Sequence, residues 1–121
     1  MAICGVGTDV VDIARFERAL RKAPGLVERL FAAPERGLPV ESLAARFAAK
    51  EAVAKALGSA GNLCWHDVIV HKASSGKPFL ELRNRAAEVA ATKGIAYWHI
   101  SLTHDGGLAM AFVIAETQEV S

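Results

Sequence analysis

The feature that most constrains the fold is an alanine-rich segment in the middle of the chain. Residues from Glu41 to Leu57 are dominated by alanine and other strong helix formers, and Gly58 follows directly as a helix terminator. We therefore predict one long helix over 41–57. Because alanine side chains are small, each buries little area, and a core built around them leaves room for stabilisation by oligomerisation.

This helix carries charges where apolar side chains are expected. Four apolar residues share one face of a helical wheel: Leu43, Phe47, Ala54 and Leu57. Lys50 falls near the middle of that face, and Glu51 and Lys55 lie along its edge one turn apart. A charge on a core-facing stripe is costly unless it is paired or bound. Two interpretations stay open: Lys50 extends to solvent beside a surface Glu51–Lys55 pair, or these charges face a metal or a phosphate-bearing ligand.

A second unusual charge is Asp9, which lies inside a β-branched run over 3–13 that predicts a strand. Aspartate is disfavoured there, and Gly5 and Gly7 just before it allow a backbone or ligand to approach closely. Asp9 is either a turn residue at the end of the strand or, with Glu51, an oxygen ligand for Mg²⁺, which takes one or two carboxylates plus substrate phosphates.

A short amphipathic helix follows the strand, with Ile13, Phe16 and Leu20 on one face. Its other face is basic and carries Arg15, Arg18, Arg21 and Lys22. A helical turn over 26–31 and a proline-rich loop lead to the long helix. Beyond that helix we expect strands at 65–72, 79–83, 97–103 and 108–114, a helix at 84–93 capped by Asn84, and turns at 74–78 and 105–107.

Helices that alternate with hairpin-connected strands are typical of an α+β domain, with a small, mostly antiparallel sheet packed against helices. A length of 121 residues suits a single domain over 1–121. The net charge of +1 gives no overall attraction to nucleic acid or to an acidic membrane. Cys4 and Cys64 share no CxxC spacing and lie far apart, which is typical of reduced thiols in a cytoplasm. The N-terminus lacks a basic region followed by an apolar run, and no apolar stretch is long enough to span a bilayer, so we expect no signal peptide and no membrane span. The histidines lack zinc-like spacing, and only His104, at a strand-to-turn boundary, lies where ligand contacts concentrate.

Four segments, in order along the chain, resemble the holo-acyl-carrier-protein synthase family of 4′-phosphopantetheinyl transferases. Arg46-Phe47-Ala48-Ala49-Lys50-Glu51-Ala52, with Lys55-Ala56-Leu57-Gly58 after it, is the most specific of them. The resemblance runs from Ile3 to Glu116, and its other segments are Gly5-Val6-Gly7-Thr8-Asp9-Val10-Val11, Gly76-Lys77-Pro78 and Ser101-Leu102-Thr103-His104.

The resemblance implies an enzyme of the 4′-phosphopantetheinyl transferase fold that moves 4′-phosphopantetheine from coenzyme A to a serine of apo acyl carrier protein. It further implies a homotrimer with active sites between subunits, Asp9 and Glu51 as Mg²⁺ ligands, and Lys55 on the phosphates. The coenzyme A site would be lined by Arg46, Lys50, Lys55, Gly76, Lys77, Pro78 and His104. Arg15, within the basic face that also holds Arg18, Arg21 and Lys22, would meet the acidic carrier protein. It stays open whether Asp9 or a metal-bound water takes the serine proton.

One segment departs from the family pattern. Residues 32–40 show no clear match to the threonine-proline-glutamate turn that many relatives carry, which leaves the carrier preference open. The alternatives are a non-catalytic coenzyme A or nucleotide-binding module of the same fold and a purely structural oligomerisation domain. The second gives Lys50 and Asp9 no role. The larger transferases made of two fused copies of the fold are disfavoured by length.

Overall fold

The computed structural model describes residues 2–58 and 63–118. These residues form five strands and four α-helices, in the order that the sequence patterns predict. They also form two short 3₁₀ turns, η1 and η2. In chain order they are β1 (Ala2–Asp12), α1 (Ile13–Lys22), α2 (Leu26–Leu30), η1 (Ala33–Glu35), α3 (Val40–Leu57), η2 (Trp65–Asp67), β2 (Val68–Lys72), β3 (Pro78–Leu82), α4 (Asn84–Thr92), β4 (Ile95–Asp105) and β5 (Leu108–Thr117).

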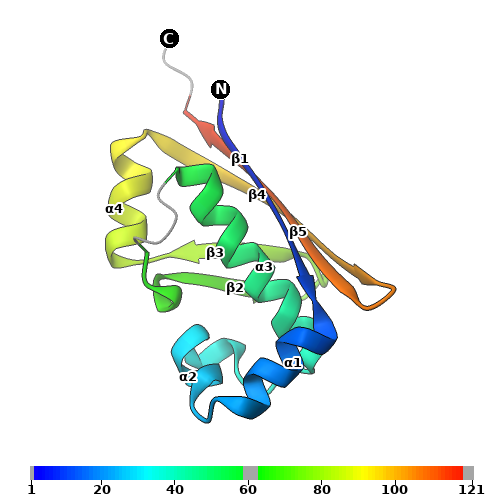
Figure 1. Cartoon of the computed structure of the whole chain (residues 1–121). Coiled ribbons are helices and arrows are strands. Elements are labelled where there is room, and N and C mark those ends of the chain that lie inside the picture. Colours follow the sequence, from blue (N-terminus) through cyan, green and yellow to red (C-terminus); the bar gives the residue numbers. More distant parts are fainter. Residues whose placement is uncertain (1, 59–62, 119–121) are drawn as a thin grey trace.

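Helix α3 lies at the centre of the molecule, along the three-stranded sheet, with α4 towards one end and α1 and α2 towards the other (Figure 1). It begins one residue earlier than predicted and ends at Gly58, which takes the left-handed conformation at φ 68°. The predicted single apolar face is too narrow, because eleven residues of α3 are buried. Small alanines allow this, since they let several elements approach the helix from different sides.

The three longest strands form one antiparallel sheet in the order β1-β5-β4. The predicted hairpin between β4 and β5 is confirmed, because Asp105 pairs with Leu108 across a two-residue turn. Gly106 and Gly107 have φ of 57° and 82°, and two successive positive values are what such a tight turn requires. Both strands run several residues beyond the predicted bounds, so the sheet is longer than the sequence pattern suggests.

Strand β1 is packed against α3 more closely than any side chain would permit. A Cβ atom on Gly7 would lie 1.8 Å from the carbonyl oxygen of Ala52, and one on Gly5 would lie 2.2 Å from that of Ala56. Successive side chains of a strand alternate between faces, so Gly5, Gly7 and Asp9 all face α3. The two glycines therefore determine how closely the Asp9 side chain approaches the helix.

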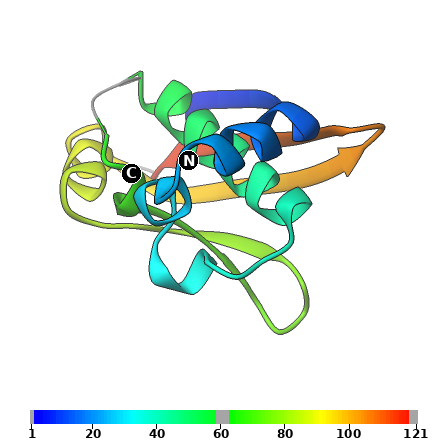
Figure 2. The ribbon, with the colours of Figure 1, turned by 60° about the horizontal axis from the view of Figure 1, so that its bottom comes forward.

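Strands β2 and β3 form a separate antiparallel hairpin, so the molecule has two sheets (Figure 2). Residues 65–67, expected within the strand, instead form η2. Asn84 is also placed differently: it is the first residue of α4, in the left-handed conformation at φ 47°, and it donates to Asp67 over 3.0 Å. Among the described residues, no helix has the length and hydropathy of a membrane span.

Candidate active site

Asp9, Glu51 and Lys55 come together where β1 crosses α3, and we call them the acid–lysine cluster. The Lys55 Nζ donates to Asp9 Oδ1 over 3.0 Å and to the backbone oxygen of Thr8 over 2.9 Å. Lys55 is half exposed and Asp9 is mostly covered, at 51% and 19% side-chain exposure. The surface Glu51–Lys55 pair expected from the helix alone is thus replaced by a pair between a strand and a helix.

The pKa of Glu51 is shifted by its burial and by the neighbouring charges. Burial raises the pKa of Glu51, the negative charge of Asp9 raises it further, and Lys55 opposes both effects. A pKa raised by a second carboxylate means that the two acids repel each other across a short space. Such a pair attracts a cation, and the ammonium of Lys55 occupies only one side of Asp9.

This donor set fits Mg²⁺. Both ligands are hard carboxylate oxygens, and Mg²⁺ in phosphate chemistry is held by one or two carboxylates while substrate phosphates and water complete its shell. Among the described residues no group of three or more His, Cys, Asp or Glu side chains could hold a metal ion by itself. The acid–lysine cluster would therefore bind Mg²⁺ weakly alone and more tightly together with a phosphate.

A second cluster of charge lies between α3, the β2–β3 turn and the end of β4, around a pocket of about 190 Å³ that we call the cationic pocket. Arg46, Lys72 and His104 are its basic lining groups, and none of its described lining residues is acidic. Two of the predicted turn residues, Gly76 and Pro78, also line it, and its other lining residues are Ser42, Ala45, Leu102 and Thr103. Three basic groups around one hollow favour an anion such as a phosphate.

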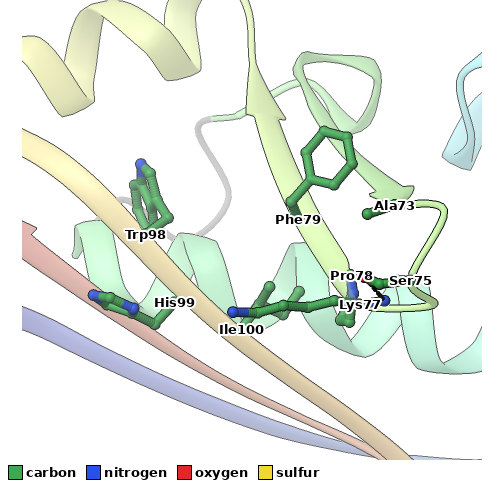
Figure 3. A pocket seen from close by; sticks show the side chains of 8 residues that line it. All are labelled: Ala73, Ser75, Lys77, Pro78, Phe79, Trp98, His99 and Ile100. Atoms are coloured by element: carbon green, nitrogen blue, oxygen red, sulfur yellow. Dashed lines mark hydrogen bonds between the residues drawn. The ribbon is translucent and has the colours of Figure 1, made fainter.

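The third predicted turn residue, Lys77, lines a neighbouring pocket of about 380 Å³ instead. Figure 3 shows this hollow between the β2–β3 turn and strand β4, which contributes Trp98, His99 and Ile100. The turn itself is tight: Gly76 has φ 90° and donates to the Ala73 oxygen over 2.8 Å. Gly76-Lys77-Pro78 thus stands as a rim between two hollows, with only Pro78 reaching both.

Lys50 is the predicted site residue whose position the structure corrects. Its side chain is only 1% exposed, and its Nζ lies 2.7 Å from Glu35 Oε1. The same ammonium donates to the backbone oxygens of Trp65, over 3.0 Å, and of Val68. An ammonium has three donors. All of its N–H groups are used inside the protein, so Lys50 is a buried partner of Glu35 and not an exposed cation.

The basic face of α1 is exposed, as the pattern predicts, with Arg15, Arg18, Arg21 and Lys22 all reaching solvent. Only Arg15 of these four also lines an apolar groove of about 400 Å³ between α1, α2 and α3. Asp9 opens onto the same groove, and the apolar lining includes Phe16, Leu26 and Phe47. The groove therefore joins the basic helix to the acid–lysine cluster.

Sequence reasoning missed three residues that the structure brings into view. Lys72 and Ser42 line the cationic pocket, and a basic residue two positions before the 74–78 turn was the available signal for Lys72. Glu35 is fully buried at 0% exposure. An acid in an apolar, proline-flanked stretch was the signal for it, and a buried acid requires a partner.

Comparison with known proteins gives a consistent result. The family model described as "4'-phosphopantetheinyl transferase superfamily" matches residues 5–113. A holo-[acyl-carrier-protein] synthase of Frankia casuarinae is 57% identical over 118 residues, which cover 97% of this chain and 100% of that protein.

Solved structures agree with this match. The crystal structure of holo-[acyl-carrier-protein] synthase from Neisseria meningitidis has a TM-score of 0.86 at 31% identity, covering 96% of this chain and 100% of that one. The Helicobacter pylori synthase, solved in complex with coenzyme A, has a TM-score of 0.81 at 31% identity, covering 92% and 99%.

Proposed function

Because the chain belongs to the 4′-phosphopantetheinyl transferase superfamily, we propose that it is a holo-acyl-carrier-protein synthase. It transfers 4′-phosphopantetheine from coenzyme A to a serine of apo acyl carrier protein and releases adenosine 3′,5′-bisphosphate. The observation that carries this proposal is the pairing of Asp9 with Lys55 beside Glu51, on the helix that also supplies Arg46 to a cationic pocket. The match over residues 5–113 supports a single transferase domain over 1–121.

The reaction needs little covalent help from the enzyme. The serine oxygen of the carrier forms a bond to the phosphorus that bears the pantetheine arm, and the bond from that phosphorus to the adenosine bisphosphate breaks. The leaving group keeps the electron pair, and the serine proton passes to a base, for which Asp9 is our candidate. Because the nucleophile belongs to the partner, the site has only to position the reactants and neutralise charge.

The residues of the acid–lysine cluster divide this work. Asp9 and Glu51 would hold Mg²⁺, which neutralises charge on the phosphoryl oxygens when it is bound. Lys55 is half exposed and carries a positive charge, so its ammonium is suited to meet the charge that develops on the transferred phosphoryl group.

The cationic pocket suits the phosphates of coenzyme A. Arg46 and Lys72 supply positive charge, His104 adds an imidazole ring that can donate a hydrogen bond, and Gly76 and Pro78 form the rim. Lys77 lines the adjoining hollow and would meet a more distant part of the same molecule. Coenzyme A is long and multiply charged, so two adjoining hollows that share a rim support its binding here.

The carrier protein would dock on α1. Acyl carrier proteins are acidic, and the exposed basic face of Arg15, Arg18, Arg21 and Lys22 offers complementary charge. The apolar groove beside Arg15 would accept apolar side chains of the carrier, and it leads to Asp9. This arrangement would bring the carrier serine to the acid–lysine cluster.

We further propose a homotrimer whose active sites lie between subunits. In the described residues, the acid–lysine cluster and the cationic pocket have no residue in common. The outer face of the three-stranded sheet exposes large apolar side chains, among them Ile3, Val6, Val10, Tyr97, Leu108, Met110 and Phe112. An exposed apolar face of this kind marks an interaction surface, and contact between copies would cover it.

The free cysteines Cys4 and Cys64 support a location in the cytoplasm.

Intact mass spectrometry of an apo acyl carrier protein tests the proposal. After incubation with the enzyme, coenzyme A and Mg²⁺, we expect the carrier to gain the mass of one phosphopantetheine arm. EDTA should abolish the gain, and restored Mg²⁺ should recover it. Unchanged mass in several apo carriers, with coenzyme A still bound, would instead favour the non-catalytic binding module.

A further inference from the structure

The buried Glu35 accepts hydrogen bonds from three groups in three separate parts of the chain. Its Oε1 accepts from the backbone N–H of Ala32 over 3.0 Å and from Lys50 over 2.7 Å. Its Oε2 accepts from the backbone N–H of Val70 over 3.0 Å. Arg46, on the same helix as Lys50, is attracted electrostatically to Glu35 as well. One carboxylate thus joins η1, α3 and β2.

These bonds close an edge that would otherwise be open. The N–H of Arg83 bonds to the Asp67 oxygen, and the N–H of Ala73 bonds to the Lys77 oxygen, each over 2.8 Å. Bonding alternates along an antiparallel strand, so the backbone N–H and C=O groups of the odd-numbered residues of β2 point toward β3. The backbone N–H and C=O groups of Val68 and Val70 therefore point away from β3, to a side where the described residues provide no neighbouring strand. An unpaired buried strand edge carries unsatisfied backbone groups unless something covers it.

Side chains of α3 and η1 occupy the place of that missing strand. Lys50 donates to the Val68 oxygen, Glu35 accepts from the Val70 N–H, and Arg46 Nε donates to the Val70 oxygen over 3.4 Å. No buried side-chain nitrogen or oxygen among the described residues lacks a hydrogen-bond partner, those of Glu35 and Lys50 included. The three side chains hold α3 and the β2–β3 hairpin in one relative position.

The charge balance gives Glu35 a particular role. Lys50 and Arg46 are both positive and lie close enough to repel each other. Burial lowers the pKa of Arg46 and of Lys50, and the charge of Glu35 raises both. Without Glu35, two cations would face each other in a poorly solvated space, and Arg46, the less buried of the two, would turn away.

We propose that Glu35 is a positioning residue for the cationic pocket: with Lys50 it braces the free edge of β2, and so fixes Arg46 and the hairpin that carries Lys72, Gly76 and Pro78. The inference rests on the proposed function, because it assigns the pocket to a phosphate of coenzyme A. Glu35 acts on ligand affinity through Arg46 and the turn, and it touches no reacting atom. The segment without a clear match to the family turn therefore still contributes the acid that organises this pocket.

The test compares Glu35→Gln with Glu41→Gln, which removes an exposed acid from the first turn of α3. Titration calorimetry with adenosine 3′,5′-bisphosphate, well below the melting temperature, reports the affinity of the folded molecules. We expect Glu35→Gln to weaken binding about tenfold, a size typical of losing a group that orients a binding residue. KM for coenzyme A should rise similarly, while kcat and KM for the carrier change less than about twofold. Glu41→Gln should match the unaltered protein.

A purely structural role for Glu35 predicts a lower melting temperature with unchanged affinity per folded molecule, and that result would overturn the inference. Absence of bisphosphate binding by the unaltered protein would instead contradict the proposed coenzyme A site itself. The two failures are thus distinguishable.

Two further measurements keep the inference testable if Glu35→Gln does not fold. Glu35→Asp keeps the charge but shortens the reach to Lys50 and Val70, and should raise KM for coenzyme A about threefold at unchanged kcat. In the unaltered protein, saturating adenosine 3′,5′-bisphosphate should slow hydrogen exchange at the Val70 N–H more than at the N–H of Val113, because coupling between sites is reciprocal. Equal slowing at both amides, or an unchanged KM in Glu35→Asp, would contradict the role of Glu35.

Discussion

The acid–lysine cluster and the cationic pocket both depend on helix α3, yet they are built in opposite ways. The acid–lysine cluster sits where two glycines bring β1 against the helix, and its polar groups are partly open to solvent. The cationic pocket sits at the edge of a hairpin and depends on a buried ion pair, Glu35–Lys50. Backbone packing positions the first cluster, and hydrogen-bonded side chains position the second.

This difference separates chemistry from binding. A carboxylate pair with a lysine can bind a cation and move protons, whereas a pocket lined by basic groups and no described acidic one is suited to hold an anion. Damage to the first cluster should therefore reduce kcat, and damage to the second should raise KM for coenzyme A. The predictions below test that division, beginning with the largest expected effect.

Asp9→Asn should break the first cluster alone. The amide keeps the shape but loses the metal ligand and candidate base, so we expect kcat to fall about a thousandfold. The affinity for adenosine 3′,5′-bisphosphate should change less than about threefold, because the cationic pocket is untouched. Rates from carrier mass and affinities from calorimetry check both statements. A full rate in this variant would remove Asp9 from the mechanism.

Gly7→Ala should disturb the packing that positions the first cluster. The added Cβ would lie 1.8 Å from the Ala52 oxygen, so β1 must move away from α3. We expect a loss of about 3 kcal/mol in the free energy of unfolding, measured with urea. Glu88→Ala, on the exposed side of α4, should change it by less than about 0.5 kcal/mol. Equal stability of the two variants would show that the close approach is not required.

Arg46→Met should affect the second cluster alone. Methionine keeps the apolar part of the side chain but removes its charge from the cationic pocket. We expect KM for coenzyme A to rise about thirtyfold, while kcat stays within about threefold of the value for the unaltered protein. Lys93→Met, which removes an exposed charge after α4, serves as the control. A large fall in kcat at saturating coenzyme A would argue against the division.

Arg15→Glu should separate a third function, carrier docking, from both clusters. Charge reversal beside the apolar groove should raise KM for the acidic carrier about tenfold and leave coenzyme A binding intact. The effect should shrink as salt is added. Arg85→Glu on α4 reverses an exposed charge away from the groove and should have no such effect. Equal losses for both substrates would contradict the assignment of Arg15.

Glu51→Gln should give the smallest effect, on the stability of the metal-free protein. The folded-state pKa of Glu51 lies above its ordinary value of 4.5, so its ionised form opposes folding at neutral pH. We expect the variant to melt about 2 °C higher than the parent at pH 8, with the difference vanishing as the pH falls below that ordinary value. Glu88→Gln, an exposed change, should show no pH-dependent difference. A pH-independent difference for Glu51→Gln would contradict the raised pKa.

The sequence predicts most of this arrangement, and its failures have physical causes. Local signals predicted α3, its end at Gly58 and the Gly106–Gly107 hairpin, because short-range backbone preferences determine them. The pairing of Asp9 with Lys55 was out of reach of a helical wheel, because it depends on how β1 crosses α3. The resemblance to a known family brought Asp9, Glu51 and Lys55 into one predicted site.

Lys50 shows where sequence reasoning fails. The helical wheel correctly placed it on a buried face, but its partner Glu35 lies in a different element and makes its bonds only in the folded chain. Without that partner in view, a ligand was the natural explanation for a buried lysine. Long-range ion pairs leave little trace in one sequence, since neither residue alone reports the distance to the other.

The most direct test of the account asks whether the two clusters meet across copies of the chain. Asp9→Asn and the double variant Arg46→Met/His104→Ala would be co-expressed with different tags, and mixed oligomers isolated by both tags. Each variant alone should be nearly inactive at low coenzyme A. If the sites lie between the subunits of a trimer, each mixed trimer joins two intact clusters at one of its three interfaces, so about a third of the sites should be restored. Activity no greater than the sum of the separate variants would show that one chain forms each site by itself.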